Sequence, residues 1–246
     1  MRIYLFVDLE TSGLDPVMDR IVEVGWMHAD GKLRRLTTTS YAVVRPVGAA
    51  LDRIMTQPVV RDMHEKTGLL RELEYRTDLP LLQGVETSML EELDQIEAAY
   101  QKFRASLSSE ELLDPDISDH IEVVLAGKNV YFDKGFIDRH MPRLAARLSH
   151  RTFDETSLKY MLDALGIGIN VVADEVAHGL MQHRAGYDVE MSFTTMRFVL
   201  EQFRAVQRGE PIDMEAYIVD SAKDEFTPMK FGEAVEEELR KMFGEQ

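Results

Sequence analysis

The sequence has no cysteine, which excludes disulfide bonds and thiolate zinc sites. It also has no apolar run approaching the roughly 18 residues that a membrane-spanning helix requires. The first residues lead into an apolar stretch with an acid at position 8, which is not the pattern of a signal peptide. We therefore expect a cytoplasmic protein with no membrane partner.

Basic residues are also scarce. The 246 residues include 28 lysines and arginines against 44 acids, a net charge of −16. The excess lies in residues 86–122, with 11 acids and 2 bases, and residues 209–246, with 11 acids and 4 bases. We expect both segments to be solvated surface. Because phosphate contacts dominate non-specific affinity for nucleic acid, such a protein should hold duplex DNA poorly.

Length and composition indicate a globular protein, either one large domain or a domain with additions. Hydrophobic residues make up 45% of the chain, which is ordinary for a folded protein. We predict a main domain over residues 1–208 with an acidic helical insertion at about 86–122. A boundary near Gly209-Glu210-Pro211 would start an acidic extension over residues 209–246.

Hydrophobic periodicity predicts alternating strands and helices. Strands are expected over residues 3–9, 20–29, 33–44 and 122–126, and helices over 58–75 with a break at Gly68, 88–107, 136–148, 156–165 and 188–206. Strands interspersed with helices predict an α/β fold in which helices pack on a sheet.

Two acids close the first predicted strand. Asp8 and Glu10 are two residues apart, so on a strand they project from the same face. An acid at the end of an apolar strand with neither partner nor metal carries a large desolvation cost. The alternative is a role in the turn that follows, near Gly13.

Two later stretches add acids and a histidine. Asp133 stands at the expected start of a helix, where it could also be an ordinary first-turn acid favoured by the helix dipole. His183 and Asp188 are five residues apart and cannot share a helix face, so we expect His183 just before a helix and Asp188 in its first turn. His178 is a rival for the role of base, but lies ten residues from Asp188.

The chemistry of these residues points to a metal site. Carboxylates are the ligands that hard divalent cations prefer. Two such ions a few ångströms apart can stabilise the attacking and leaving oxygens of a phosphodiester. A histidine with a pKa of about 6.5 suits proton abstraction at neutral pH.

The three motifs, taken in order, resemble those of a known family. Asp-x-Glu, Asn-x-x-Phe-Asp and His-x-x-x-x-Asp are similar to the motifs of the DEDDh exonucleases, over about residues 3–206. The resemblance implies a ribonuclease H-like fold with a mixed five-stranded sheet. It also implies removal of nucleotides from 3′ ends with two Mg²⁺ or Mn²⁺ ions. Asp8, Glu10, Asp133 and Asp188 would be the metal ligands, and His183 the general base that deprotonates the attacking water.

One branch of this superfamily resembles more of the chain. Residues 8–16 and 63–69 are similar to two segments of the oligoribonucleases. This resemblance implies that Leu14 and His64 contact terminal bases and that Arg151 contacts the 5′ phosphate of very short RNAs. It also implies a homodimer.

The middle motif departs from that branch. Oligoribonucleases usually have Gly-Asn-Ser there, whereas this chain has Gly127-Lys128-Asn129. Asn129, which we predict to contact substrate, belongs to a motif closer to that of polymerase proofreading exonucleases. The first alternative is therefore a DNA 3′→5′ exonuclease, for proofreading or end trimming. A separate alternative, from another class, is a non-catalytic nucleic-acid-binding protein that kept the fold.

Four arginines recur at four-residue spacing: Arg139, Arg143, Arg147 and Arg151. On a helix they would form one positive stripe. The stripe could be a solvated face, a track for substrate phosphates or a seam with a second subunit.

Overall fold

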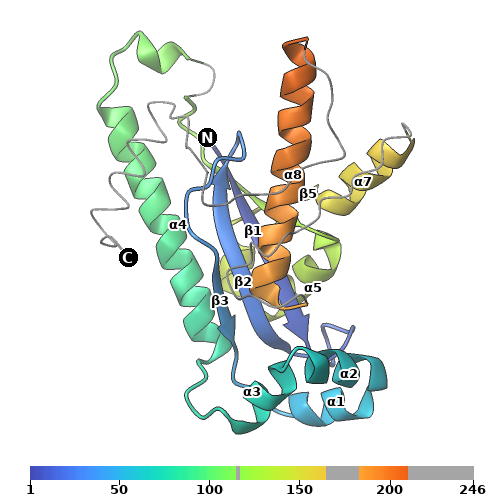
Figure 1. Ribbon diagram of the computed structural model, residues 1–246. Helices are drawn as coiled ribbons and strands as arrows, with labels where there is room; N and C mark the ends of the chain where they lie inside the picture. The colour runs from blue at the N-terminus through green and yellow to red at the C-terminus, as the bar shows by residue number, and fades with distance from the viewer. Residues whose placement is uncertain (115–116, 165–182, 210–246) are drawn as a thin grey trace.

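A mixed five-stranded sheet forms the centre of the computed structural model, which describes residues 1–114, 117–164 and 183–209 (Figure 1). The strand order is β3-β2-β1-β4-β5. β1 pairs antiparallel with β2 and parallel with β4, while β3 is antiparallel to β2 and β5 is parallel to β4. The strands are β1 (Arg2–Thr11), β2 (Ile21–Asp30), β3 (Ser40–Val43), β4 (Glu122–Gly127) and β5 (Leu148–Asp154). The expected α/β fold is confirmed, and it matches the ribonuclease H-like fold that the resemblance implies.

Helices cover both faces and one end of the sheet (Figure 1). They are α1 (Ala50–Thr56), α2 (Pro58–Lys66), α3 (Leu69–Tyr75), α4 (Leu82–Ala105), the 3-10 helix η1 (Glu111–Leu113), α5 (Val130–His140), α6 (Pro142–Ala145), α7 (Glu155–Ala164) and α8 (Ala185–Gln207). The break between α2 and α3 falls at Gly68, as expected, because Gly68 has a left-handed φ of 74°. Within the described part of the chain, every helix is too short or too polar to span a lipid bilayer.

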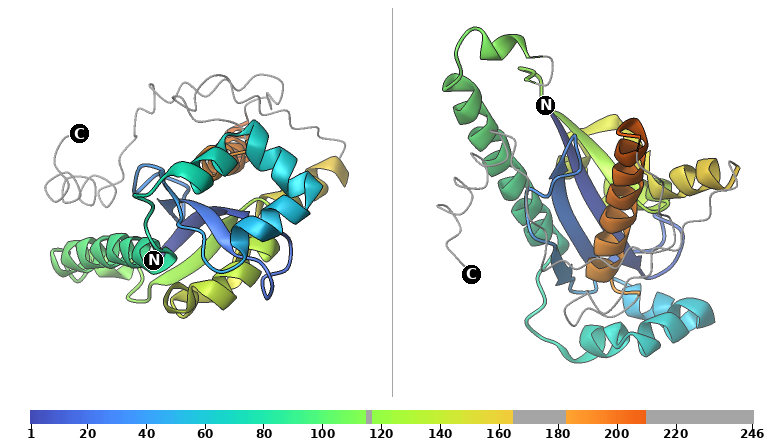
Figure 2. Two further views of the ribbon diagram at one scale, coloured as in Figure 1. Left: turned by 90° about the horizontal axis from the view of Figure 1, so that it is seen from below. Right: turned by 45° about the horizontal axis from the view of Figure 1, so that its top comes forward.

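The alternation of side chains along β1 decides which helix packs on which face. Tyr4 and Phe6 pack with Phe193 of α8 on one face. Leu5 and Val7 pack on the other face, in a cluster with α4 and α5 (Figure 2). Asp8 and Glu10 have the same parity as Phe6, so the sequence of β1 directs both carboxylates to the α8 face.

The acidic segment 86–122 contributes to this core. Its helix, α4, places Met89 and Leu93, both fully buried, in the same cluster as β1. Glu86 is also buried and accepts hydrogen bonds from the backbone N–H groups of Arg143 and Leu144, at 2.8 and 3.0 Å, so it is not the solvated acid we expected. The proposed domain boundaries remain predictions, and residues 210–246 of the acidic extension lie outside the described residues.

The helix expected over residues 136–148 is wrong. α5 begins six residues earlier, at Val130, and ends at His140, and Leu148 already belongs to β5. Pro142 explains the ending, because proline has no N–H to continue the helix and its ring collides with the preceding turn. The third strand is also shorter than residues 33–44, since Leu33 has a φ of 57° and regular pairing starts only at Ser40.

This ending of α5 removes the arginine stripe. The four arginines lie on separate elements: Arg139 on α5, Arg143 on α6, Arg147 in the following turn and Arg151 on β5. Three pair with acids at 2.8 to 3.1 Å: Arg143 with Glu86, Arg147 with Asp94 and Arg151 with Glu122. The predicted stripe is therefore wrong, and these arginines neutralise acids of the same chain.

If α4 is part of the core, Leu93→Ala should destabilise the whole domain. The lost contacts and the resulting cavity should cost about 2–5 kcal/mol, measured by urea unfolding. Leu113→Ala is the matched control, because Leu113 is 80% exposed in η1 of the same acidic segment. Its effect should stay within about 0.5 kcal/mol. Equal stabilities of the two variants would show that α4 is dispensable to the fold.

Candidate functional site

Three carboxylates converge where β1 meets the start of α8. Asp8 and Glu10 come from the end of β1, and Asp188 lies in the first turn of α8, as expected. One carboxylate oxygen from each lies within 4.8 Å of the other two. Glu10 is buried, and Asp8 and Asp188 are partly buried. The structure thus brings together acids that are about 180 residues apart in the chain.

Asp133 approaches this group from the opposite face of the sheet. It lies in the first turn of α5, is buried, and accepts a hydrogen bond at 3.0 Å on Oδ1 from the backbone N–H of Leu9. This bond ties α5 to the end of β1, between Asp8 and Glu10 in sequence. Asp133 is outside the group of mutually close oxygens, yet after desolvation its charge has the largest effect on the Asp8 pKa.

Burial raises the pKa values of all four acids, and repulsion from neighbouring acids adds to this rise for Asp8, Glu10 and Asp188. Desolvation raises the pKa of Asp8 well above its ordinary range, and the charges of Asp133 and Asp188 add to the effect. Desolvation, followed by the charge of Glu23, raises the pKa of Glu10 to about 8. Desolvation raises the pKa of Asp133 to about 7 and also raises that of Asp188. A nearby positive charge would favour the ionised form of these acids.

His183 lies two residues before α8, as expected, in an exposed turn with a left-handed φ of 59°. Its charge is the first factor, after desolvation, that acts on the pKa of Asp188, and it lowers that pKa. His183 therefore lies near the acid group and open to solvent. The rival His178 lies outside the described residues.

Two cationic groups near Asp188 or its helix were missed by the sequence analysis. Lys128 is exposed, directly follows β4, and lowers the pKa of Asp188 through its charge. Arg184, between His183 and α8, bonds the carboxylate of Glu23 on β2 at 2.7 to 3.0 Å. Two features of the sequence could have indicated the Glu23–Arg184 pair. Glu23 lies on a predicted strand at a position that faces the same side as its buried neighbours, and Arg184 directly follows the motif histidine.

Leu14 and His64 occupy different environments. Leu14 is 75% exposed in the loop after β1, where it is free to contact a ligand. His64 is fully buried, and its Nε2–H donates a hydrogen bond to the Thr11 carbonyl oxygen at 2.9 Å. Its Nδ1 lies 3.9 Å from Oε2 of Glu10, so the buried ring packs beside one of the three carboxylates.

Asn129 and Arg151 lie outside the acid group. Asn129 has a φ of 53° and turns the chain sharply from β4 into α5, while its N–H donates to Asp154 Oδ1 at 2.9 Å. Arg151 pairs with Glu122 at the start of β4, whereas Asp8 lies near the carboxyl end of the parallel strand β1. Arg151 is thus turned toward the end of the sheet away from Asp8, Glu10 and Asp188.

The chain resembles curated oligoribonucleases along most of its length, although no protein-family profile matches it. It is 25% identical over 208 residues to the oligoribonuclease of Chromobacterium violaceum, covering 82% of this chain and 96% of the relative. Identity to the Streptomyces avermitilis oligoribonuclease is 29% over 206 residues, with coverages of 83% and 88%. The oligoribonuclease of Mycobacterium sp. strain KMS is 28% identical over 157 residues, 63% of this chain and 61% of that relative.

Solved structures similar to the chain include exonuclease I. The enzyme of Methylocaldum szegediense is 18% identical, with a TM-score of 0.49, over 82% of this chain and 41% of that one. Escherichia coli exonuclease I in complex with a dT13 oligonucleotide has a TM-score of 0.48 and 17% identity, over 84% and 42%. The chain thus spans about two fifths of the length of these exonuclease I chains.

The order of the three motifs, the mixed five-stranded sheet and the similarity to oligoribonucleases agree with one another. The sequence similarity reaches nearly the full length of the Chromobacterium relative, so it is not confined to one motif. Together these findings support a 3′→5′ exonuclease of the DEDDh superfamily that is oligoribonuclease-like in sequence.

Proposed function

We propose that the protein hydrolyses short RNA or other single-stranded 3′ ends in a metal-dependent 3′→5′ direction, releasing nucleoside 5′-monophosphates. The observation that carries this proposal is the convergence of Asp8, Glu10 and Asp188 within 4.8 Å, with Asp133 bonded to the same strand end. Acids gathered this closely, each with a raised pKa, form a site suited to divalent cations and unfavourable without them.

The donor set fits Mg²⁺ or Mn²⁺. All four groups are carboxylates, and the described residues offer no thiolate that would favour a softer metal. Asp8, Glu10, Asp133 and Asp188 would hold two ions. When bound, these ions would stabilise charge on the attacking and leaving oxygens of the phosphodiester.

His183 would be the general base. Its exposed imidazole, near Asp188, can accept a proton from the attacking water at neutral pH. The water oxygen then bonds to phosphorus, the bond from phosphorus to the 3′ oxygen breaks, and that oxygen takes up a proton. Lys128, also near Asp188, could bind a substrate phosphate.

Short RNA is the favoured substrate, because oligoribonucleases are the relatives that match the chain along most of their length. Leu14, exposed in the loop that follows Glu10 and β1, is available to contact a terminal base. A homodimer would allow Arg151, which is turned away from the carboxylate cluster of its own chain, to reach the site of the other subunit. The Asn129-x-x-Phe132-Asp133 motif favours a DNA exonuclease as the second candidate. A cytoplasmic location remains a prediction from the sequence.

Asp188→Asn should abolish hydrolysis of a labelled RNA trimer, lowering the rate by at least about 10³-fold, because the cluster would lose a metal ligand. Glu190→Gln is the matched control, since Glu190 lies on the same helix but pairs with Arg35 on the loop after β2. It should retain most of the activity. Wild-type rates in Asp188→Asn with Mg²⁺ present would contradict the metal site.

Stability of the metal-free protein should fall as pH rises from about 4 to about 8. The pKa of Glu10 is raised to about 8 in the folded state, so in this window the folded chain keeps protons that the unfolded chain has released. Because protons compete with metal, saturating Mg²⁺ should raise Tm more at pH 8 than at pH 6. At 100 times Kd the gain is about 2.7 kcal/mol, or roughly 5–10 °C for a chain of this size.

Differential scanning calorimetry at the two pH values measures this effect. Asp8→Asn removes a ligand and should abolish the Mg²⁺-dependent shift at both. A Mg²⁺ shift of equal size at pH 6 and pH 8 would contradict the proton competition.

A panel of 5′-labelled RNA and DNA oligomers, from dinucleotides to 20-mers, would test the substrate. We expect kcat/KM to be highest for RNA dimers and trimers. Equal attack on long single-stranded DNA would favour the DNA exonuclease. If nothing is hydrolysed and calorimetry detects no Mn²⁺ binding, the non-catalytic alternative stands.

A further inference from the structure

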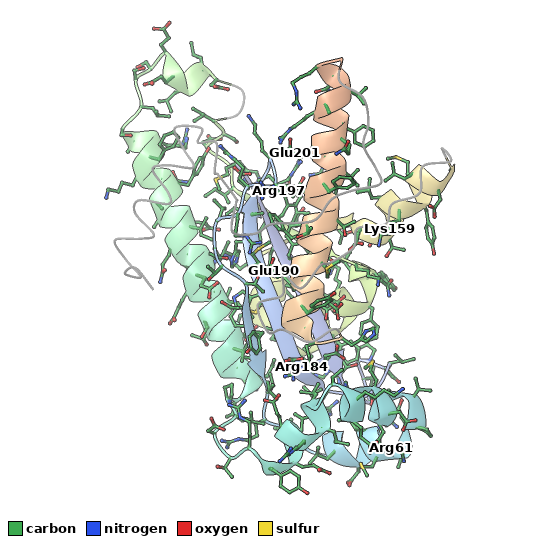
Figure 3. All side chains as sticks on the ribbon, in the orientation of Figure 1. Arg61, Lys159, Arg184, Glu190, Arg197 and Glu201 are labelled. Carbon is green, nitrogen blue, oxygen red and sulfur yellow. The ribbon has the colours of Figure 1, made fainter. Side chains whose placement is uncertain are left out.

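We propose that Arg184 is a positioning residue for His183, because it clamps the turn before α8 to strand β2. The inference rests on the proposed function, in which His183 is the base. Figure 3 shows Arg184 at the end of α8 that lies nearest α2 and α3, with Glu190 farther along the helix.

The clamp starts from Glu23, which lies directly opposite Glu10 in the pairing of β2 with β1. Like Met27 on the same strand, Glu23 has the parity that faces α8. Its side chain is fully buried, and its two oxygens accept three hydrogen bonds at 2.7 to 3.0 Å from the Arg184 guanidinium. A buried carboxylate beside the acid group is thus neutralised by the residue that follows His183.

The backbone at the start of α8 is held at the same place. The N–H of Ala185 donates to Glu23 Oε2 at 3.2 Å. Two residues along β2, Gly25 lies so close to α8 that a Cβ on it would come within 2.4 Å of the Ala185 carbonyl group. Gly25 in turn pairs with Asp8 on β1, so the contact sets how near α8 approaches the first metal ligand.

Arg184 also binds the helices at the end of the sheet. Its Nη1 lies 2.9 Å from Oε1 of Glu72 on α3, and donates to the carbonyl oxygen of Thr67, after α2, at 3.4 Å. One guanidinium thus joins β2, the α2–α3 segment and the turn that carries His183. Arginine suits this task because its planar group donates in several directions at once, which lysine cannot match.

His183 depends on this clamp more than Asp188 does. His183 is exposed and lies outside the helix, in a left-handed conformation that few residues adopt without support. Asp188 lies within α8, and Val189 and Phe193, which follow it on that helix, are buried against the sheet. Weakening the Arg184 contacts should therefore displace the imidazole while the helix keeps its acid in place.

The test uses Arg184→Lys and Glu23→Gln in the full chain, with an RNA trimer as substrate and circular dichroism to verify folding. Arg184→Lys should lower kcat by about 10- to 100-fold, the range expected for a catalytic group misplaced by about 1 Å. KM and the calorimetric Kd for Mn²⁺ should each stay within about threefold. Glu23→Gln keeps one acceptor oxygen and removes the negative charge. Its decrease in kcat should therefore be smaller than that of Arg184→Lys.

Arg35→Lys is the matched control. Arg35 forms a bidentate pair with Glu190 of α8, with two contacts of 2.8 Å, so it also anchors this helix. Among the described residues, the hydrogen bonds of Arg35 go to Thr39 and Glu190 and not to residues 183 and 184. The kcat of Arg35→Lys should therefore stay within about threefold of wild type. Equal losses of kcat in Arg35→Lys and Arg184→Lys would mean that both only anchor the helix, and would overturn the inference.

The background variant His183→Ala separates positioning from structure. If Arg184 acts through His183, Arg184→Lys should cause no further loss of rate in this background. A further loss of 10-fold or more, weakened Mn²⁺ binding in Arg184→Lys, or a wild-type kcat in Arg184→Lys alone would each overturn the inference while leaving the proposed function intact. Wild-type rates in His183→Ala would overturn the role of His183 and the inference with it.

Discussion

Repulsion among carboxylates is the constraint on which the rest of this structure depends. Asp8, Glu10 and Asp188 share a space only 4.8 Å across, and Asp133 raises the pKa of Asp8 further. Left alone, such a group favours protonation or separation of the acids. The fold opposes separation by fixing the acids on three rigid elements: Asp8 and Glu10 on β1, Asp133 on α5 and Asp188 on α8. The result is a site with unfavourable electrostatics of the kind that a bound divalent cation relieves.

The sheet supplies that rigidity because helices pack against both of its faces. On one face, Phe6 and Phe193 meet at 5.5 Å in an edge-to-face contact and hold α8 beside the acids of β1. On the other face, α5 packs with α4 against the odd-numbered residues of β1, and Asp133 reaches back to the N–H of Leu9. The acids thus meet at the strand end, where helices from both faces can contribute.

Charge elsewhere in the chain is handled by local pairing. Glu86, Glu23 and Glu122 each bond to an arginine, and Glu122 has its pKa lowered to about 2 by bonds to Arg151, Arg2 and Ser149. The net charge of −16 is therefore not spread evenly over the surface, because several acids are paired with arginines within the fold. Three of the four arginines that the sequence offered for binding substrate phosphates, Arg143, Arg147 and Arg151, are paired with acids of the same chain.

Local sequence patterns did not predict β5, but they did predict the other four strands of the central sheet, the parity of Asp8 and Glu10, and the positions of His183 and Asp188 around the start of a helix. These follow from local rules, since strand alternation and helix periodicity act over a few residues. The end of α5 before Pro142 is also a local signal, because proline breaks a helix. The tertiary structure was needed to show that His64 is buried behind Glu10 and that Glu23 pairs with Arg184. Such contacts join residues up to 161 positions apart, and no local pattern encodes which face of which element will meet them.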